Sequence, residues 1–209
     1  MAEDGGRPRA AARALEQLKG TLRPLAEEPD RPADLRAAGV LALIDGRRAE
    51  LPLLLERRSH DLRSHPGQVG LPGGSLTETD GTLWQAALRE AEEELAVPPE
   101  AVRVLGYLDP VVIAHSGFLM VPAVALVRRD FTPRADPSEV SGWFWLPLLQ
   151  AHTGVQDVVR RRHTSRGSLL VPGYLQGRDF VWGAARVVVD RLRRGLGEHF
   201  PEPAPIQEP

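Results

Sequence analysis

The chain has 209 residues, of which 42% are hydrophobic and 26% charged, so it can bury a sizeable core and wholesale disorder is excluded. Its formal net charge of −2 excludes a global positive field that would attract nucleic acid or an anionic membrane. The absence of cysteine excludes disulfides, thiolate zinc sites, iron–sulfur clusters and cysteine nucleophiles.

The start of the chain, residues 1–4, lacks the basic residues and the apolar run of a signal peptide. The longest apolar stretch, residues 118–127, is far too short to cross a bilayer and contains Pro122. We therefore expect a cytoplasmic protein with no nucleic-acid or membrane partner.

Apolar periodicity predicts, in chain order, a helix, two strands, a second helix, up to four strands and a last helix. These elements are expected at residues 10–22, 39–45, 51–58, 82–97, 102–108, 118–127, 142–146, 169–175 and 180–194. Mixed elements of this kind favour an α/β or α+β sandwich in which two or three helices cover a mixed sheet. We divide the chain into an N-terminal extension (1–36), one domain (37–198) and a proline-rich tail (199–209) that is expected to be disordered.

A polar, glycine-punctuated loop is predicted at residues 59–75, between the second strand and the second helix. A loop of that length inside a compact domain usually has a function. It ends in Leu71-Pro72-Gly73-Gly74, and glycines there allow close approach of the backbone with exposed N–H groups. This turn is therefore suited to phosphate.

The helix at residues 82–97 has the clearest boundaries. Thr82 and Gln85 match a capping box, and Pro98 and Pro99 stop the helix. Its core-facing stripe is predicted to contain Trp84, Ala87, Leu88, Ala91 and Leu95.

Three carboxylates share another face of this helix, because residues three and four apart lie on neighbouring turns. They are Glu90, Glu93 and Glu94, whereas Glu92 points away and Arg89 lies beside the acidic face. Like charges this close repel each other, so the arrangement favours a hard cation such as Mg²⁺, which takes carboxylate oxygens, water and phosphate. The alternative is a solvated acidic face. The phosphate-suited turn just upstream favours the metal–phosphate site.

Residues 74–97, GSLTETDGTLWQAALREAEEELAV, resemble the Nudix box, G-x5-E-x7-R-E-U-x-E-E-x-G-U with U aliphatic. Residues 89–94 match its R-E-U-x-E-E heart at every specified position. Asp80 stands where glutamate is usual and is followed by one extra residue, but it can still pair with the box arginine. Ala96 replaces the late glycine, so an ordinary helical backbone is expected there in place of a left-handed cap.

The upstream loop resembles the signature of one Nudix subgroup, the coenzyme A pyrophosphatases, which is roughly L-L-T-x-R-S-x3-R-x-H-x-G-x-V-x-F-P-G-G. The matching residues lie between Leu54 and Gly74, with Glu56 in place of threonine and Leu71 in place of phenylalanine. The extra residue and the aspartate in the box also resemble this subgroup. The whole resemblance spans roughly residues 37–194.

This resemblance implies a Nudix-type α/β/α sandwich with a mixed sheet and an N-terminal helical extension. It implies metal-dependent hydrolysis of a diphosphate bond in coenzyme A or its derivatives, giving 3′,5′-ADP and 4′-phosphopantetheine. Mg²⁺ would be the cofactor, with Mn²⁺ as a substitute. Glu90, Glu93 and Glu94 would bind the metal, and Arg89 would orient them. The base that activates water is left open between Glu90 and Glu139.

Substrate contacts are expected from the loop and the turn, at Arg58, Arg63, His65, Gln68, Gly73 and Gly74. An arginine fork there could bind the ribose 3′-phosphate that distinguishes coenzyme A from its dephospho form. Alternatively, the loop arginines pair with Glu56, Asp61 or the diphosphate itself. The three arginines at 160–162 could also bind phosphate, although a solvated face is the commoner role for such a run.

Two other functions stay open at this point. A Nudix hydrolase for another nucleotide, such as ADP-ribose, a dinucleotide or a nucleoside triphosphate, would use the same carboxylates. A non-catalytic Nudix domain that senses a nucleotide would have less need of three crowded carboxylates, so the intact R-E-x-x-E-E core opposes it. If the protein is an enzyme, its expected partner is a small nucleotide diphosphate, bound by a monomer or a homodimer.

Overall fold

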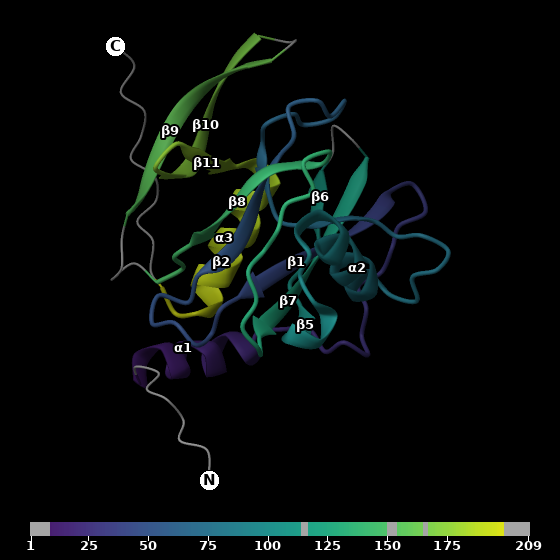
Figure 1. Ribbon diagram of the computed structural model, residues 1–209, viewed down its shortest axis with the longest axis vertical. Coiled ribbons are helices and arrows are strands. Elements are labelled where there is room, and N and C mark those ends of the chain that lie inside the picture. The colour runs from purple at the N-terminus through teal and green to yellow at the C-terminus, as the bar shows by residue number, and fades with distance from the viewer. Residues whose placement is uncertain (1–8, 114–116, 150–153, 165–166, 199–209) are drawn as a thin grey trace.

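The computed structural model describes residues 9–113, 117–149, 154–164 and 167–198, so the expected tail at 199–209 lies outside the described residues (Figure 1). A large mixed sheet has the strand order β3-β2-β1-β7-β5, with β4 also paired to β1, β6 to β7 and β8 to β2. Its strands are β1 (Arg36–Ile44), β2 (Leu53–Arg58), β3 (Val69–Gly70), β4 (Gly73–Ser75), β5 (Val102–Tyr107), β6 (Val111–Ile113), β7 (Phe118–Val127) and β8 (Val140–Leu146).

The centre of this sheet is the parallel pair β1–β7, in register from Arg36 opposite Phe118 to Ile44 opposite Leu126. The other pairs that β1 and β7 make, with β2, β4, β5 and β6, are antiparallel, so the sheet is mixed as predicted. Side chains alternate between the two faces of a strand, and both faces of β1 are apolar because both are covered.

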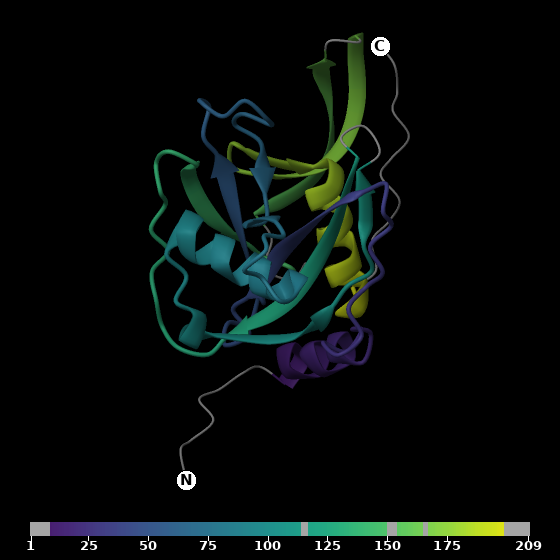
Figure 2. The same ribbon diagram turned by 90° about the vertical axis from the view of Figure 1, so that its right-hand side faces the viewer.

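Helices cover both faces of the sheet, which confirms the predicted α/β/α sandwich (Figure 2). Helix α2 (Leu83–Leu95) packs on one face, where Ala87 and Ala91 join a core cluster with Leu41 and Leu43 of β1. Helices α1 (Arg9–Lys19) and α3 (Gly183–Gly195) belong to the core cluster of the opposite face.

A second sheet of three antiparallel strands lies beside the first, at the edge that carries β3 (Figure 1). Its strands are β9 (Val155–Thr164), β10 (Gly167–Gln176) and β11 (Asp179–Trp182). The 180–194 helix prediction is therefore wrong at its start, because residues 180–182 pair with β10 and α3 begins only at Gly183, which has a φ of 61°.

The predicted loop at residues 59–75 is partly structured. Strand β3 pairs with β2 (Glu56 opposite Gly70), and β4 pairs with β1 (Gly39 opposite Gly74). Both segments are too short and too rich in glycine to show the alternation that predicts a strand.

Helix α2 begins as predicted, because the hydroxyl of Thr82 accepts a hydrogen bond from the backbone N–H of Gln85. It ends differently. Ala96 is left-handed, with a φ of 51°; its N–H donates to the carbonyl of Glu92, and the N–H of Val97 donates to the carbonyl of Ala91. The prediction of an ordinary helical backbone at Ala96 was therefore wrong, since the end of the helix imposes the left-handed cap despite the cost of a Cβ.

The N-terminal helix is part of the main core. Ala11, Leu15 and Leu18 of α1 are buried in the same cluster as α3. After α1 the chain is hydrogen-bonded to the sheet. The backbone N–H of Arg23 donates to the carbonyl of Tyr107, and the carbonyl of Arg23 accepts from the N–H of Tyr107. In the part of the chain that the structure describes, each helix is too short or too polar to traverse a membrane.

Candidate active site

Arg89 organises the acidic face of α2. Its guanidinium donates two hydrogen bonds to Asp80, Nε to Oδ1 at 3.1 Å and Nη2 to Oδ2 at 3.0 Å, so the shortened acid of the box still reaches its arginine. Its Nη1 lies 3.0 Å from Glu90 Oε1 and 3.0 Å from Glu93 Oε2. Arg89 thus joins the loop before α2 to two of the three predicted carboxylates.

Glu94 points inward, beneath the turn that precedes α2. Its side chain is only 2% exposed, and its Oε2 accepts a hydrogen bond of 2.9 Å from the backbone N–H of Gly73. Its Oε1 lies 3.8 Å from Arg58 Nη1 at the end of β2. The N–H of Gly73, which was expected to face phosphate, is therefore directed to a helix carboxylate.

Glu56 is a member of this cluster that the sequence reasoning did not assign to the site. It lies on β2, its side chain is 1% exposed, and Arg58 Nη1 is 3.8 Å from its Oε1. Its other oxygen, Oε2, is buried without a hydrogen-bond partner. The signal was available, because a glutamate at the end of a Leu53-Leu54-Leu55 run is a charged residue on a strand buried on both faces.

The two glycines of the turn bring the backbone close to the helix. A Cβ on Gly74 would lie 2.5 Å from the carboxyl carbon of Glu90, and a Cβ on Gly73 would lie 2.3 Å from the carbonyl oxygen of Gly39. Gly73 also has a φ of 148°. Glycine is thus required at position 73 for β4 to lie against β1, whereas a side chain at position 74 would displace the carboxylate of Glu90.

Two further glutamates lie at the rim. The side chain of Glu93 is 58% exposed, and Glu139 is also exposed, just before β8. The backbone carbonyl of Glu139 accepts a hydrogen bond of 2.7 Å from the N–H of Ser59, which holds it next to the end of β2. The predicted trio therefore runs along one helix face from buried Glu94 through half-buried Glu90 to exposed Glu93.

Burial, and after it neighbouring negative charge, raises the pKa of three carboxylates in this cluster. Burial, followed by the charge of Glu56, raises the pKa of Glu94 well above its usual range. Burial also raises the pKa of Glu56, with the charges of Glu139 and Glu90 adding to the effect and Arg58 opposing it. Burial is again the largest cause of the raised pKa of Glu90. The negative charges of these carboxylates therefore influence one another, and the cluster holds more negative than positive charge.

The predicted substrate-binding residues divide between this cluster and the loop. Arg58 faces the carboxylates, which matches the alternative that it pairs with Glu56. Arg63 and His65 are exposed, and His65 Nδ1 lies 3.2 Å from Gln68 Oε1. The loop and the cluster are joined by the backbone, since the N–H of Arg58 donates to the carbonyl of Gln68.

The cluster fits a divalent cation by the chemistry of its donors, because hard cations take carboxylate oxygens and Glu56 offers one that is buried and unsatisfied. In the described residues, no three His, Cys, Asp or Glu side chains form a ready-made metal-binding group. The oxygens of Glu94 are instead contacted by Arg58 and by the N–H of Gly73.

The sandwich, together with a carboxylate-faced helix packed under a glycine turn, defines a Nudix-type pyrophosphohydrolase. The NUDIX domain model matches residues 34–166. The chain is 42% identical over 170 residues to the uncharacterized Nudix hydrolase NudL of Shigella flexneri, covering 79% of this chain and 85% of that protein. It is also 42% identical over 166 residues to NudL of Escherichia coli O157:H7, covering 78% and 83%. The chain therefore belongs to the Nudix hydrolase family, whose members generally use divalent metal ions.

Two solved structures are also similar over part of the chain. An Ap4A hydrolase of C. elegans has a TM-score of 0.46 and 19% identity, covering 53% of this chain and 80% of that one. A MutT NUDIX hydrolase of Burkholderia pseudomallei has a TM-score of 0.42 and 27% identity, covering 54% and 83%.

Proposed function

We propose that this protein hydrolyses the diphosphate bond of coenzyme A or one of its derivatives, giving 3′,5′-ADP and 4′-phosphopantetheine. The observation that carries the proposal is the contact of Arg58 with Glu94 at 3.8 Å. Arg58 belongs to the segment that resembles the coenzyme A pyrophosphatase signature, and Glu94 belongs to the Nudix box. The two motifs adjoin at Gly74, and this contact joins a residue of each in one carboxylate site.

Glu90, Glu93 and Glu94 would hold Mg²⁺, or Mn²⁺ in its place, and Glu56 would add a fourth carboxylate. The bound cation would offset the charge that develops on the diphosphate and make a coordinated water more acidic. Arg89, fixed by Asp80, would keep Glu90 and Glu93 in position.

The reaction needs a base for the attacking water. The water oxygen forms a bond to one phosphorus, the bond from that phosphorus to the bridging oxygen breaks, and the water proton passes to a carboxylate. Glu139, exposed at the rim and bonded through its carbonyl to Ser59, is our first candidate, and Glu90 is the second. Arg58, Arg63, His65 and Gln68 would contact the substrate from the loop side, with Gly73 and Gly74 forming the floor beneath it.

The proposal is tested by a substrate panel of coenzyme A, dephospho-coenzyme A, ADP-ribose, a dinucleoside polyphosphate and nucleoside triphosphates, each with Mg²⁺ or Mn²⁺. The expected result is the highest kcat/KM on coenzyme A or an acyl derivative, with products identified by mass. A higher kcat/KM on ADP-ribose or a nucleoside triphosphate would overturn the substrate assignment. Binding without turnover of any member would overturn the proposed catalysis.

A further inference from the structure

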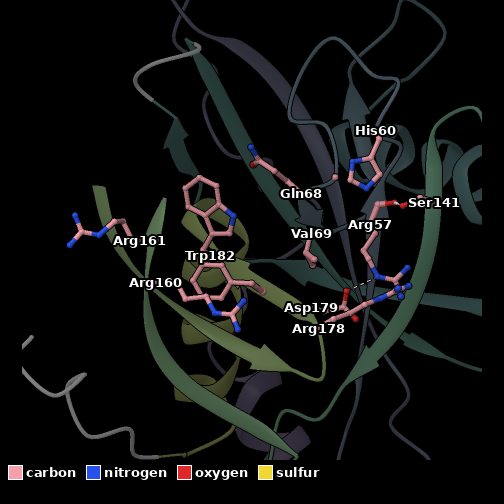
Figure 3. Close-up of a pocket in the computed structure, with 12 residues that line it drawn as sticks. Arg57, His60, Gln68, Val69, Ser141, Arg160, Arg161, Arg178, Asp179 and Trp182 are labelled. Carbon is pink, nitrogen blue, oxygen red and sulfur yellow. Dashed lines mark hydrogen bonds and ion pairs between the residues drawn. The ribbon is translucent and has the colours of Figure 1, made fainter. Parts of the chain in front are cut away.

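A basic cavity of about 490 Å³ lies outside the carboxylate cluster, between the loop after β2 and the three-stranded sheet (Figure 3). Residues that border it include Arg57, His60, Arg160, Arg161, Arg178 and Trp182. Figure 3 shows these side chains around the cavity, from β2, the loop after it, β9, the β10–β11 turn and the end of β11, with Arg161 pointing outward.

The cavity and the carboxylate cluster lie on opposite faces of β2. Successive side chains of a strand alternate, so Arg57 points to the cavity while Glu56 and Arg58 point to α2. The two sites are also connected through the backbone at the end of β2. Gln68 borders the cavity, and its carbonyl accepts a hydrogen bond from the N–H of Arg58. A ligand that extends around the end of β2 can therefore reach both.

Positive charge in this cavity exceeds negative charge. Asp179 is the carboxylate that borders it, and it is already paired with Arg57 Nε at 2.5 Å. Arg160 lies over the ring of Phe180, 5.4 Å from its centre. Within the described ranges of the chain, neither Arg160 nor Arg178 has an ion-pair partner, so both guanidinium groups are available to an anion.

We propose that this cavity binds a phosphomonoester carried by the substrate, which for coenzyme A is the ribose 3′-phosphate. Guanidinium forks bind the oxygens of a phosphate dianion through paired, charge-assisted hydrogen bonds. The inference rests on the proposed function for its substrate, and it moves 3′-phosphate recognition from Arg58, which faces the carboxylates, to the opposite face of β2.

The direct test is binding without turnover. Isothermal titration in metal-free buffer compares 3′,5′-ADP with 5′-AMP, which lacks the 3′-phosphate. Wild-type protein should bind 3′,5′-ADP more tightly, and the double variant Arg160→Ala/Arg178→Ala should lose that preference, by roughly ten- to a hundredfold in affinity. Among the residues that the structure describes, the two arginines chosen have no carboxylate partner, whereas Arg57→Ala would leave buried Asp179 unpaired.

Arg103→Ala is the matched control, because Arg103 is an exposed arginine on β5, at the opposite edge of the sheet. It should leave the preference for 3′,5′-ADP unchanged. Equal affinity of wild-type protein for the two nucleotides, or an unchanged preference in a folded double variant, would overturn the inference.

A kinetic comparison separates this inference from the proposed function. The double variant should lose kcat/KM on coenzyme A selectively and keep it on dephospho-coenzyme A. Equal losses on both substrates would overturn the cavity assignment while leaving coenzyme A hydrolysis intact. If wild-type protein cleaves neither substrate, the proposed function fails, and the titration still decides whether the cavity binds the phosphomonoester.

Discussion

Glu56 and Glu94 face each other from a strand and a helix, with Arg58 as the cation between them. Each is almost fully buried, and Arg58 Nη1 is 3.8 Å from an oxygen of both. One guanidinium does not neutralise two carboxylates, and burial raises the pKa of both groups. The site therefore carries like-charge repulsion that costs stability, an arrangement that is common where a protein binds a cation.

The first prediction concerns Glu94→Gln. The amide keeps the shape and the acceptor for the N–H of Gly73 but removes one negative charge. Turnover at saturating Mg²⁺ should fall by at least about 10²-fold, the scale of losing a catalytic group. The free energy of unfolding in metal-free buffer should stay equal or rise, as measured by urea denaturation. Glu92→Gln, on an exposed face, is the control. Near-normal turnover, or a marked loss of stability, would contradict this role.

The second prediction concerns the base. Glu139→Gln should lower kcat by about 10²- to 10⁴-fold while the concentration of Mg²⁺ needed for half-maximal activity barely changes. The reason is that Glu139 lies at the rim and is not one of the carboxylates assigned to the metal. Persistent activity in this variant would assign the base to Glu90 on the helix.

Spacing in the sequence predicted which carboxylates share a face of α2, but it could not predict how deep each one lies. Glu94 is buried and Glu93 is exposed because β4 lies against the side of that face that carries Glu90 and Glu94. Strand β4 itself could not be foreseen from Gly73-Gly74-Ser75. In the sequence, Glu56 stood out only because it replaces the threonine of the coenzyme A pyrophosphatase signature. Its meeting with Glu94 depends on long-range strand pairing that one sequence does not specify.

At the scale of elements, the site depends on how β4 fits between β1 and α2. Gly73→Ala should destabilise the fold by at least about 1–3 kcal/mol, the usual cost of a strained backbone, because its φ is 148° and the new Cβ would meet the backbone of β1. Gly74→Ala should cost less stability, since its Cβ meets only the mobile end of Glu90, but it should lower kcat. Urea denaturation and steady-state kinetics of both variants test this third prediction. Equal stability losses would contradict it.

The loop before α2 is tied to the helix by the Asp80–Arg89 pair, which gives a fourth prediction. Hydrogen bonds from Arg89 hold the pKa of Asp80 far below its usual range. A lowered pKa in the folded state means that the pair contributes stability above the unfolded pKa of about 3.9 and loses it as pH falls toward the folded value. Asp80→Asn should therefore lower the free energy of unfolding at pH 6, and the difference from wild type should shrink below about pH 4. A difference that is independent of pH would contradict the pair's contribution.

Helices and strands could be predicted from the sequence where the apolar pattern extends over many residues. The apolar run of β7 and the capped start of α2 were both recognised, since strand burial and N-capping leave local signals. The backbone of Ala96 could not be predicted in this way. No glycine marks the end of α2, so the sequence indicated a helical backbone, but the tertiary structure forces the left-handed cap. Residues 180–182 likewise pair as a strand because β10 is beside them.

On the scale of the whole molecule, the N-terminal extension contributes to the main core. Leu15 of α1 is 1% exposed and belongs to the same cluster as α3. As a fifth prediction, Leu15→Ala should lower the free energy of unfolding by about 2–5 kcal/mol, with a single unfolding transition. Arg13→Ala, at an exposed position of the same helix, is the control. A separate early transition for α1 would contradict its integration into the core.

The fold brings three distant segments to one place. The end of β2 supplies Glu56 and Arg58, α2 supplies Glu90 and Glu94, and the start of β8 brings Glu139 beside them through its bond to Ser59. The basic cavity lies on the reverse side of the same strand. In the proposed function, the carboxylate site would cleave the diphosphate of the nucleotide and the cavity would recognise its phosphomonoester.

The central claim is most directly tested by the mass of the products formed from coenzyme A and Mg²⁺ in water enriched in oxygen-18. The account predicts 3′,5′-ADP and 4′-phosphopantetheine, with one heavy oxygen entering one of the two products per turnover. Release of inorganic phosphate with formation of dephospho-coenzyme A, or coenzyme A left intact while another nucleotide is cleaved, would contradict it.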